Sequence, residues 1–428
     1  MTLGILGGGL TGLALADLFG EGCEILEADA ACGGLCRTVV RNGFSYDYGG
    51  HILFSRDREA LDYLLGALGG NAVRYRRNNR ILFKGRFVKY PFENDLAALP
   101  KDDVYDCLYH FLTRAFPEPS NFKEWCYYRF GKGIAERYLI PYNEKIWNID
   151  PALLGLEWVV GRVPEPPLED VLKSALGIET EGYTHQLNFH YPRRGGIEAL
   201  VRALEARVGA LEKGFQVKAV GGKRGAWVVS DGRREKRYDR LVSTIPLPDL
   251  IDALDGVPEE VLRAARLLRY NSLICVMVGF RSASPSDKFA VYLPQSEHRF
   301  HRVCFYDYFG DSSVPQGMSC AVAEITANRG DGTFEMTDGE LVEHVAAGLA
   351  REGFFQRGDV CLTDVARRKH AYVVNDLGYA KNLAIARGFI EKSGIVLCGR
   401  FAEWQYLNMD ACARHAMETA AALREGRE

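Results

Sequence analysis

Residues 2–27 constrain the fold most, because two short apolar runs there flank a glycine-rich loop. The loop has the G-x-G-x-x-G spacing of dinucleotide-binding strand–loop–helix units. Gly7 allows a tight turn, Gly9 lets the backbone approach a pyrophosphate, and Gly12 lets the helix pack closely on the strand. Free N–H groups at the start of that helix can bind phosphate oxygens. The predicted phosphate-binding residues are Gly7, Gly9, Leu10, Thr11 and Gly12.

An acidic residue, Glu27, ends the second apolar run and can accept hydrogen bonds from a ribose diol. Ala28 follows it, and no arginine is present there to bind a ribose 2′-phosphate. The pair Gly33-Gly34 then offers a second close approach of the backbone to a cofactor. A glycine-rich turn in an unrelated α/β protein, or a simple β-turn at Gly33-Gly34, is the alternative interpretation.

Composition excludes several classes of protein. The chain has 428 residues, 47% of them apolar and 25% charged, with a net charge of −3, as expected for two or three globular domains. Without a basic tail, nucleic acid is not expected as the main partner. We see no signal peptide and no apolar run long enough to span a membrane, and therefore expect a cytoplasmic protein without membrane insertion. The eleven scattered cysteines match no zinc-site spacing, so buried or loop thiols in a reducing compartment are expected, and no metal.

The rest of the chain alternates between β-rich and helical patterns. A hairpin is predicted over residues 80–92, with its turn at Lys84-Gly85, and helical periodicity extends from 94 to about 154. A helix is expected after Gly196, running as far as Val208. Further elements are predicted as strands at 215–220, 227–229, 239–246, 272–280, 300–305, 319–326 and 394–400, and helices near 338–352 and from 410 onward.

These patterns predict an α/β fold with a Rossmann-like cofactor domain, an inserted helical domain and an antiparallel β-sheet domain. The cofactor domain takes residues 1–75, 190–265 and 385–428. The helical domain takes residues 94–170, and the sheet domain, which contributes to the substrate site, takes 76–93 and 266–384. In such folds the ligand lies at the carboxyl edge of the parallel sheet.

Motifs at both ends of the chain resemble those of the FAD-dependent amine oxidase superfamily, which includes protoporphyrinogen oxidases. The similar segments are the glycine loop, Gly33-Gly34, residues 244–246 and the segment beginning at Gly399. The resemblance implies FAD as the bound dinucleotide.

A narrower resemblance is to UDP-galactopyranose mutases. The segment 48–52, which contains His51, resembles a Gly-Pro-His-Ile motif that places a histidine beside the flavin. Residues 142–151 resemble a run in which Tyr142 would stack on the uracil and Trp147 would line the sugar pocket. Residues 162–164 resemble an Arg-Ile-Pro segment, and residues 399–410 resemble the family's Gly-Arg-Leu-x-x-x-x-Tyr-Tyr-x-Met-Asp run.

The sequence also departs from that family. Gly50 replaces a proline, Leu53-Phe54-Ser55 replaces Phe-His-Thr, Glu165 stands where a second arginine is usual, and Leu407-Asn408 replaces Tyr-Asp. These departures suit a relative that acts on another nucleotide sugar.

The resemblance implies a mutase that interconverts pyranose and furanose forms of a nucleotide sugar. Reduced FAD would attack the anomeric carbon through its N5, with no net redox change. The implied FAD-binding residues, beyond the loop, are Glu27, Ala28, Gly34, Leu35, Gly49, Gly50, His51, Val217, Thr244, Gly399, Arg400, Asn408, Met409 and Asp410. Such enzymes act in cell-surface polysaccharide biosynthesis, and a homodimer is compatible with the resemblance.

The leaving diphosphate requires fixed cationic and hydroxyl donors. The implied catalytic residues are His51, Arg162, Arg302, Tyr372 and Tyr406, and all but His51 would also bind the substrate together with Tyr142 and Trp147. Surface arginines, core aromatics and a histidine that only satisfies a backbone carbonyl are the alternatives.

Two other functions stay open at this point. The superfamily motifs fit equally well an oxidase or desaturase of the amine oxidase or protoporphyrinogen oxidase type, which passes a hydride to FAD. A flavin-binding protein without catalytic activity is the third alternative.

Overall fold

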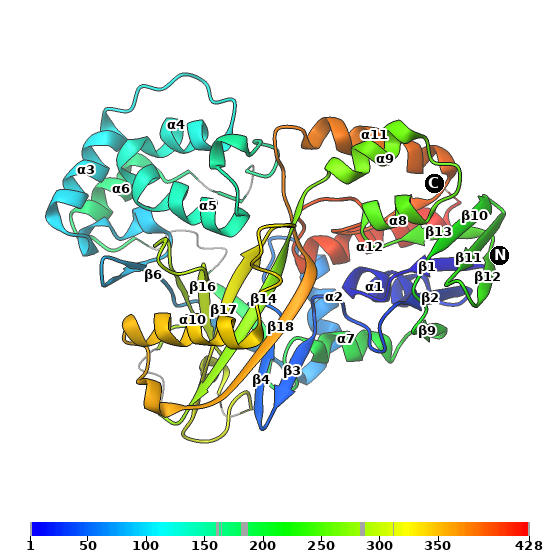
Figure 1. Cartoon of the computed structure of the whole chain (residues 1–428), viewed down its shortest axis with the longest axis horizontal. Coiled ribbons are helices and arrows are strands. Elements are labelled where there is room, and N and C mark those ends of the chain that lie inside the picture. The colour runs from blue at the N-terminus through cyan, green and yellow to red at the C-terminus, as the bar shows by residue number, and fades with distance from the viewer. Residues whose placement is uncertain are drawn as a thin grey trace.

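A five-stranded parallel sheet with the strand order β19-β13-β1-β2-β9 forms the centre of the cofactor-binding region (Figure 1). The structure, a computed structural model, describes residues 2–159, 162–163, 165–180, 187–282, 287–310 and 312–426. The five strands are β1 (Leu3–Leu6), β2 (Cys23–Glu27), β9 (Leu211–Lys213), β13 (Arg240–Ser243) and β19 (Val396–Leu397). All four neighbouring pairs are parallel, as predicted for a Rossmann-like domain.

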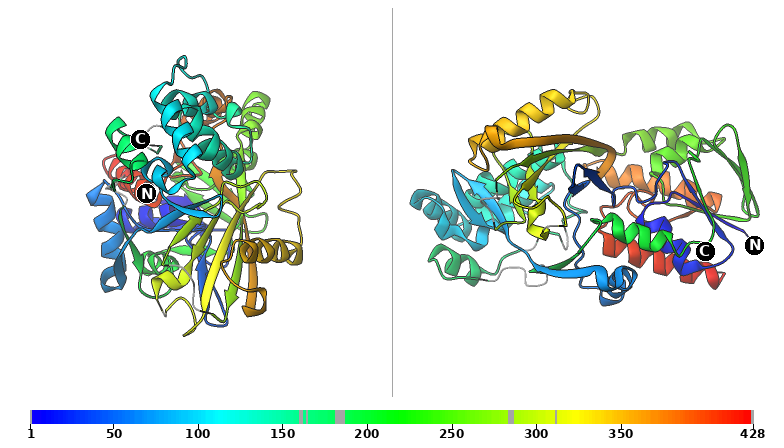
Figure 2. Two further views of the ribbon diagram at one scale, coloured as in Figure 1. Left: turned by 90° about the vertical axis from the view of Figure 1, so that its left-hand side faces the viewer. Right: turned by 90° about the horizontal axis from the view of Figure 1, so that it is seen from below.

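The predicted strand–loop–helix–strand unit is confirmed as β1, α1 (Leu10–Phe19) and β2. Helix α1 is rich in small and apolar residues, and every residue from Leu10 to Ala16 is buried. It packs against α12 (Met409–Arg424), the last helix of the chain. Figure 2 shows the two chain ends on the same side of the molecule, so residues from both ends build one region.

The second sheet has seven strands in the order β18-β14-β17-β16-β15-β6-β7. Its pairs are antiparallel except for β6 and β15, which run parallel, so the sheet predicted as antiparallel is mixed. Helix α10 (Asp338–Arg351) packs on β14 and β18. The strands are β6 (Asn79–Phe83), β7 (Arg86–Lys89), β14 (Tyr270–Phe280), β15 (Ala290–Tyr292), β16 (Arg302–Phe305), β17 (Ser319–Ala327) and β18 (Val360–Val373).

A helical region lies beside this sheet, in the upper left of Figure 1. Its core contains Phe111, Phe122, Phe130 and Trp147, which are all buried. Helices α4 and α5 are joined by a π-helix over Ala135–Leu139. The helices are α3 (Lys101–Leu112), α4 (Phe122–Ile134), α5 (Ile140–Trp147) and α6 (Leu168–Ala175).

The remaining elements connect these three regions. They include the hairpin of β3 (Thr38–Arg41) and β4 (Phe44–Asp47), and the antiparallel pair of β5 (Ala72–Arg76) and β8 (Asn188–Pro192). A three-stranded antiparallel sheet contains β10 (Ala219–Lys223), β11 (Ala226–Ser230) and β12 (Glu235–Tyr238). The other helices are α2 (Arg58–Leu68), α7 (Glu198–Glu205), α8 (Leu247–Ala253), α9 (Glu259–Leu267) and α11 (Tyr379–Ser393).

Three predicted boundaries are wrong. The strand expected at 215–220 begins only at Ala219, because Phe215 makes a single backbone bond to Glu27 and no strand ladder. The strand expected at 394–400 shrinks to Val396–Leu397, since Gly394 caps α11 and Gly399 turns with φ +88°. The helix expected to reach Val208 ends at Glu205.

Three further findings concern membrane-spanning helices, cysteines and possible metal ligands. In the described part of the chain, no helix combines the length and apolar character needed to cross a membrane. All eleven cysteines lie in the described part and are free thiols, nine of them buried. The described residues also contain no group of three or more histidine, cysteine, aspartate or glutamate side chains that could hold a metal ion.

Candidate active site

The glycine loop is open on one side and closed on the other. A Cβ atom added at Gly9 would meet no atom within 4 Å, whereas one at Gly12 would lie 2.0 Å from the Gly7 carbonyl oxygen. Gly12 is therefore required for the packing of α1 on β1, and Gly9 faces open space. Among the described residues no side chain caps the N-terminus of α1. The N–H groups of its first turn are thus available to a phosphate.

Glu27 is fixed by the backbone around it. Its Oε2 accepts a hydrogen bond from the Gly8 N–H at 2.7 Å, and its Oε1 accepts one from the Asp29 N–H at 2.8 Å. Each carboxylate oxygen retains capacity for another bond, as a ribose diol requires. The Phe215 N–H donates to the Glu27 carbonyl at 2.8 Å, which brings the segment containing Val217 to the same place.

The C-terminal segment closes the loop from the other end of the chain. A Cβ atom at Gly399 would lie 2.4 Å from the Thr11 Oγ1, so Gly399 packs directly on α1. The Gly399 N–H donates to Glu403 at 2.8 Å, and Glu403 also contacts His415 Nδ1 at 2.8 Å. Helix α12 begins immediately afterwards, with Asn408 as its N-cap.

A cavity of about 310 Å³ extends from this loop toward the helical region. It is enclosed by segments that are far apart in sequence, and most of the predicted site residues line it. Those residues are Gly9, Leu10, Thr11, Gly34, Leu35, Gly49, Gly50, His51, Thr244, Arg302, Tyr372, Arg400, Tyr406, Asn408, Met409 and Asp410.

His51 lies on the wall of this cavity as a neutral imidazole. Burial, together with the positive charges of Arg400 and Arg302, lowers the pKa of His51 to about 4. Its Nδ1 is buried and has no hydrogen-bond partner in the described part of the chain. A neutral imidazole can donate one hydrogen bond and accept another, so His51 can bind a hydroxyl group.

Arg302 is held by a carboxylate that the sequence did not indicate. Glu324 is completely buried, and its two oxygens accept from Arg302 Nε at 2.9 Å and Nη2 at 2.7 Å. Glu324 also accepts from the Gly50 N–H at 3.1 Å. This pair fixes both the guanidinium and the backbone next to His51. Three of the five N–H donors of Arg302 stay available for a ligand.

Tyr372, Tyr406 and Arg400 form the adjoining wall, whereas Arg162 packs on the Tyr406 ring and does not line this cavity. The rings of Tyr372 and Tyr406 lie edge to face, 5.5 Å apart. The Arg400 guanidinium lies 4.7 Å from the centre of the Tyr406 ring, and the Arg162 guanidinium lies 3.5 Å from it. Burial raises the pKa of the Tyr372 hydroxyl, which therefore stays protonated as a hydrogen-bond donor.

Other predicted residues lie outside the cavity wall. Trp147 is 2% exposed and packs edge-on behind Tyr372 and Tyr406. Tyr142 packs on Tyr292 and His301. Gly7 and Gly12 lie inside the loop, and Glu27, Ala28 and Val217 lie at the end of the loop where a ribose is expected. Pro164, of the segment 162–164, lies outside the described residues.

Sequence reasoning missed Glu324, Arg77, Asn79 and Tyr292. The last three line the cavity, and Glu324 supports Arg302. Glu324 is the one charged residue in the otherwise uncharged strand β17, a signal that could have identified it. Arg77 and Asn79 belong to the polar run 76–80 just before the predicted hairpin.

Comparison with known proteins agrees with this geometry. The model of the family described as flavin containing amine oxidoreductase matches residues 19–423. The chain belongs to this family. FAD, the cofactor expected from the sequence, is confirmed by this membership and by the likeness to a mutase described next. The open face at Gly9, the uncapped α1 and the oriented Glu27 carboxylate fit such a dinucleotide.

Solved structures of this fold include both mutases and oxidases. A reduced UDP-galactopyranose mutase is 25% identical, with a TM-score of 0.92 over 99% of this chain and 95% of that one. A candidate protoporphyrinogen oxidase from Exiguobacterium sp. 255-15 is 18% identical, with a TM-score of 0.77 over 100% and 99%. Cyclohexylamine oxidase from Brevibacterium oxydans IH-35A is 15% identical, with a TM-score of 0.69 over 99% of each chain.

Proposed function

We propose that this protein is an FAD-dependent mutase that interconverts the pyranose and furanose forms of a nucleotide-linked sugar. The observation that carries the proposal is the likeness over nearly the whole chain to a UDP-galactopyranose mutase, at a TM-score of 0.92. The cyclohexylamine oxidase, for comparison, has a TM-score of 0.69. The departures at Gly50, Glu165 and Asn408 favour a sugar other than galactose.

The FAD-binding residues of this proposal divide into three groups, the first of which lies outside the cavity wall. Glu27, Ala28 and Val217 would hold the adenosine end, and the backbone from Gly7 to Gly12 with Gly34 and Leu35 would hold the diphosphate. Residues of the third group would surround the flavin ring: Gly49, Gly50, His51, Thr244, Arg400, Asn408, Met409 and Asp410. Gly399 packs on Thr11 beside them and does not line the cavity. Reduced FAD supplies a nucleophilic nitrogen for the anomeric carbon, without net redox change.

The leaving group of such a reaction is a nucleoside diphosphate, and the cavity wall can hold it. The three remaining N–H donors of Arg302 and the hydroxyls of Tyr372 and Tyr406 can each bind phosphate oxygens. Arg162 and Arg400 lie against the Tyr406 ring and add positive charge. Because Glu324 partly neutralises Arg302, these neighbours supply much of the net charge that a diphosphate requires.

The sugar itself would meet His51. A neutral His51 can orient a sugar hydroxyl but cannot act as a cationic acid at neutral pH. Trp147 would act through Tyr372 and Tyr406, whose rings it supports. Stacking of Tyr142 on a nucleotide base, cytoplasmic location, homodimer formation and a role in polysaccharide biosynthesis stay predictions.

The main alternative is an FAD-dependent oxidase or desaturase. One observation favours it, because Tyr372 and Tyr406 form an edge-to-face aromatic pair that could receive an amine substrate. Arg302 and Arg400 on the same wall, however, would repel a protonated amine. The mutase is therefore the better fit.

The two functions separate in one experiment. The purified flavoprotein is incubated with a panel of nucleotide sugars, with and without dithionite, and products are analysed by chromatography. We expect furanose product only when the flavin is reduced. Peroxide release from an amine or porphyrinogen without dithionite, and no sugar product, would overturn the mutase proposal. Arg302→Lys serves as a matched variant, and we expect it to retain flavin but bind the nucleotide sugar at least tenfold more weakly.

A further inference from the structure

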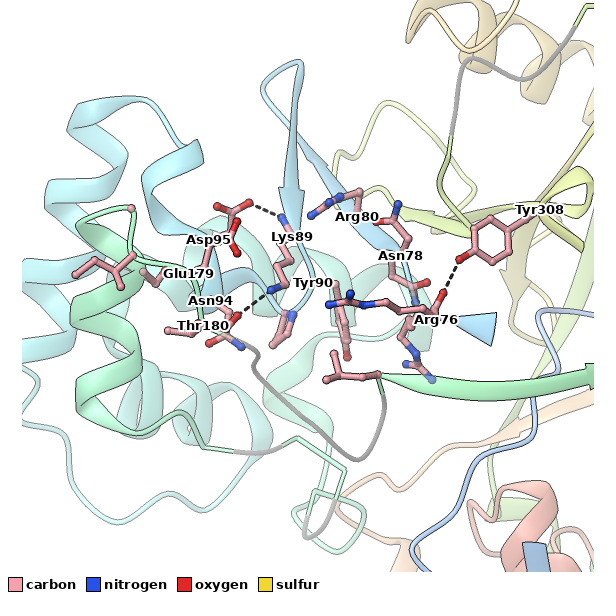
Figure 3. Close-up of a pocket in the computed structure, with 17 residues that line it drawn as sticks. Arg76, Asn78, Arg80, Lys89, Tyr90, Asn94, Asp95, Glu179, Thr180 and Tyr308 are labelled. Atoms are coloured by element: carbon pink, nitrogen blue, oxygen red, sulfur yellow. Dashed lines mark hydrogen bonds between the residues drawn. The ribbon is translucent and has the colours of Figure 1, made fainter. Parts of the chain in front are cut away.

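A second cavity, of about 510 Å³, opens beside the flavin cavity (Figure 3). It lies between the β6–β7 hairpin, the end of β5 and the segment that follows α6. Four cationic side chains line it, from Arg76, Arg77, Arg80 and Lys89. Only two acidic side chains, those of Asp95 and Glu179, are among its described lining residues. We call this cavity the basic pocket.

Several polar groups in the basic pocket are available to a ligand. The backbone of Arg80 pairs with β7 and β15, but its guanidinium makes no hydrogen bond or ion pair with any residue that the structure describes. Figure 3 shows this side chain beside Lys89. Asn94, which also lines the pocket, is only 6% exposed. The Oγ1 of Thr180 is also buried there without a hydrogen-bond partner.

The two carboxylates offset only part of the charge of the four cationic side chains, so the lining stays net positive. The Asp95 carboxylate already accepts the Lys89 backbone N–H at 2.7 Å. The Lys89 ammonium donates one hydrogen bond, to the Thr180 carbonyl at 2.8 Å, and therefore keeps two donors for another acceptor. An oxyanion would meet this ammonium and the Arg80 guanidinium together.

The basic pocket and the flavin cavity share two lining residues, Arg77 and Asn79. Asn79 donates to the Tyr292 hydroxyl at 3.1 Å, and its buried Oδ1 has no partner in the described part of the chain. The two cavities are therefore adjacent, and a ligand that spans them would place one group at the flavin and a second group in the basic pocket.

We propose that the basic pocket binds a phosphate group of the substrate, separate from the diphosphate held by Arg302, Tyr372 and Tyr406. That this phosphate is distinct from the diphosphate rests on the proposed function, which assigns the diphosphate to the flavin cavity. A phosphate suits the pocket better than a carboxylate, because its three terminal oxygens can accept from guanidinium, ammonium and amide donors at once. The substrate class is then a nucleotide sugar that carries an additional phosphate.

The test measures binding of inorganic phosphate to the FAD-loaded protein by isothermal titration calorimetry. We expect Arg80→Gln to weaken phosphate binding at least tenfold. Arg74→Gln, which changes an exposed arginine of β5 outside the pocket, is the matched control and should change affinity less than twofold. Arg80→Lys, which keeps the charge, should give an intermediate affinity and replaces Arg80→Gln if that variant does not fold.

The outcomes separate this proposal from the proposed function. Equal phosphate affinity in Arg80→Gln and wild type, or equal losses in Arg80→Gln and Arg74→Gln, would overturn the phosphate site. If malonate binds more tightly than phosphate and Arg80→Gln abolishes this binding, the phosphate proposal is overturned and the pocket is a carboxylate site. An absence of mutase activity in the wild type, with phosphate binding dependent on Arg80, would overturn only the proposed function.

Discussion

At its nucleotide end, the flavin cavity is built from the backbone of Gly9 and Gly34, whereas at its reaction end it is built from side chains. Those side chains, His51, Arg302 and Tyr372, come from distant segments of the chain. The nucleotide end depends on the absence of Cβ atoms, as the 2.0 Å contact at Gly12 shows. The reaction end depends on buried support, above all on Glu324. The nucleotide end should therefore lose its function when side chains are added, and the reaction end should lose its function when side chains are removed.

The largest effect is expected for Glu324→Ala. Removing this carboxylate leaves Arg302 uncompensated in a mostly buried position, which costs about 3–5 kcal/mol in the free energy of unfolding. Chemical denaturation of the flavin-loaded protein measures the loss. The double variant Glu324→Met with Arg302→Met should lose less free energy of unfolding than Glu324→Ala alone. A larger loss would contradict the view that Arg302 depends on its ion pair with Glu324.

The nucleotide end is tested by Gly12→Ala against Gly9→Ala. We expect Gly12→Ala to cost about 1–3 kcal/mol in stability and to abolish flavin binding, because the new methyl group collides with the Gly7 carbonyl. Gly9→Ala should cost about 1 kcal/mol or less in the protein without flavin. It should still weaken FAD binding at least tenfold, measured by flavin fluorescence. Equal stability of both variants would show that the loop tolerates side chains on its closed side.

At the reaction end, Tyr372→Phe removes a single hydroxyl donor. We expect the affinity for nucleotide sugar to fall about five- to tenfold, the equivalent of a hydrogen bond of about 1–1.5 kcal/mol. Tyr379→Phe is the control, since the Tyr379 hydroxyl donates to the Trp404 carbonyl at 2.6 Å, away from the cavity. The control should lower thermal stability without changing affinity. An unchanged affinity in Tyr372→Phe would remove this residue from the substrate site.

The smallest effect concerns the pH dependence of stability. The pKa of His51 is about 4 in the folded protein against 6.5 for an unperturbed histidine, so the unfolded chain binds more protons between these values. The free energy of unfolding should therefore fall as the pH is lowered through that window. His51→Gln should reduce this slope, measured by denaturant midpoints from pH 7 to pH 4.5. Identical slopes in the two proteins would mean that His51 is solvated.

The sequence located the cofactor more completely than the substrate. The glycine spacing and Glu27 act locally, within one strand–loop–helix–strand unit, so their arrangement follows from chain connectivity. The failures at Phe215 and Gly399 have a tertiary cause, because single contacts to Glu27 and α1 replace the predicted strand ladders. Trp147 was expected in the sugar pocket from resemblance, and only packing places it behind the tyrosines.

By itself, the sequence predicted a dinucleotide site at the first βα turn, because a tight turn and a backbone contact need glycine at fixed positions, and such spacing is visible along the chain. Resemblance to a known superfamily implied that the dinucleotide is FAD, and the family membership confirms this cofactor. Only the tertiary structure decided which charges face the flavin cavity. Glu324 binds Arg302, and Arg77 and Asn79 line both that cavity and the basic pocket. Arg302 meets Glu324 because β16 and β17 pair in that register, and the positions of Arg77 and Asn79 follow from packing between separate segments, which the sequence spacing does not show.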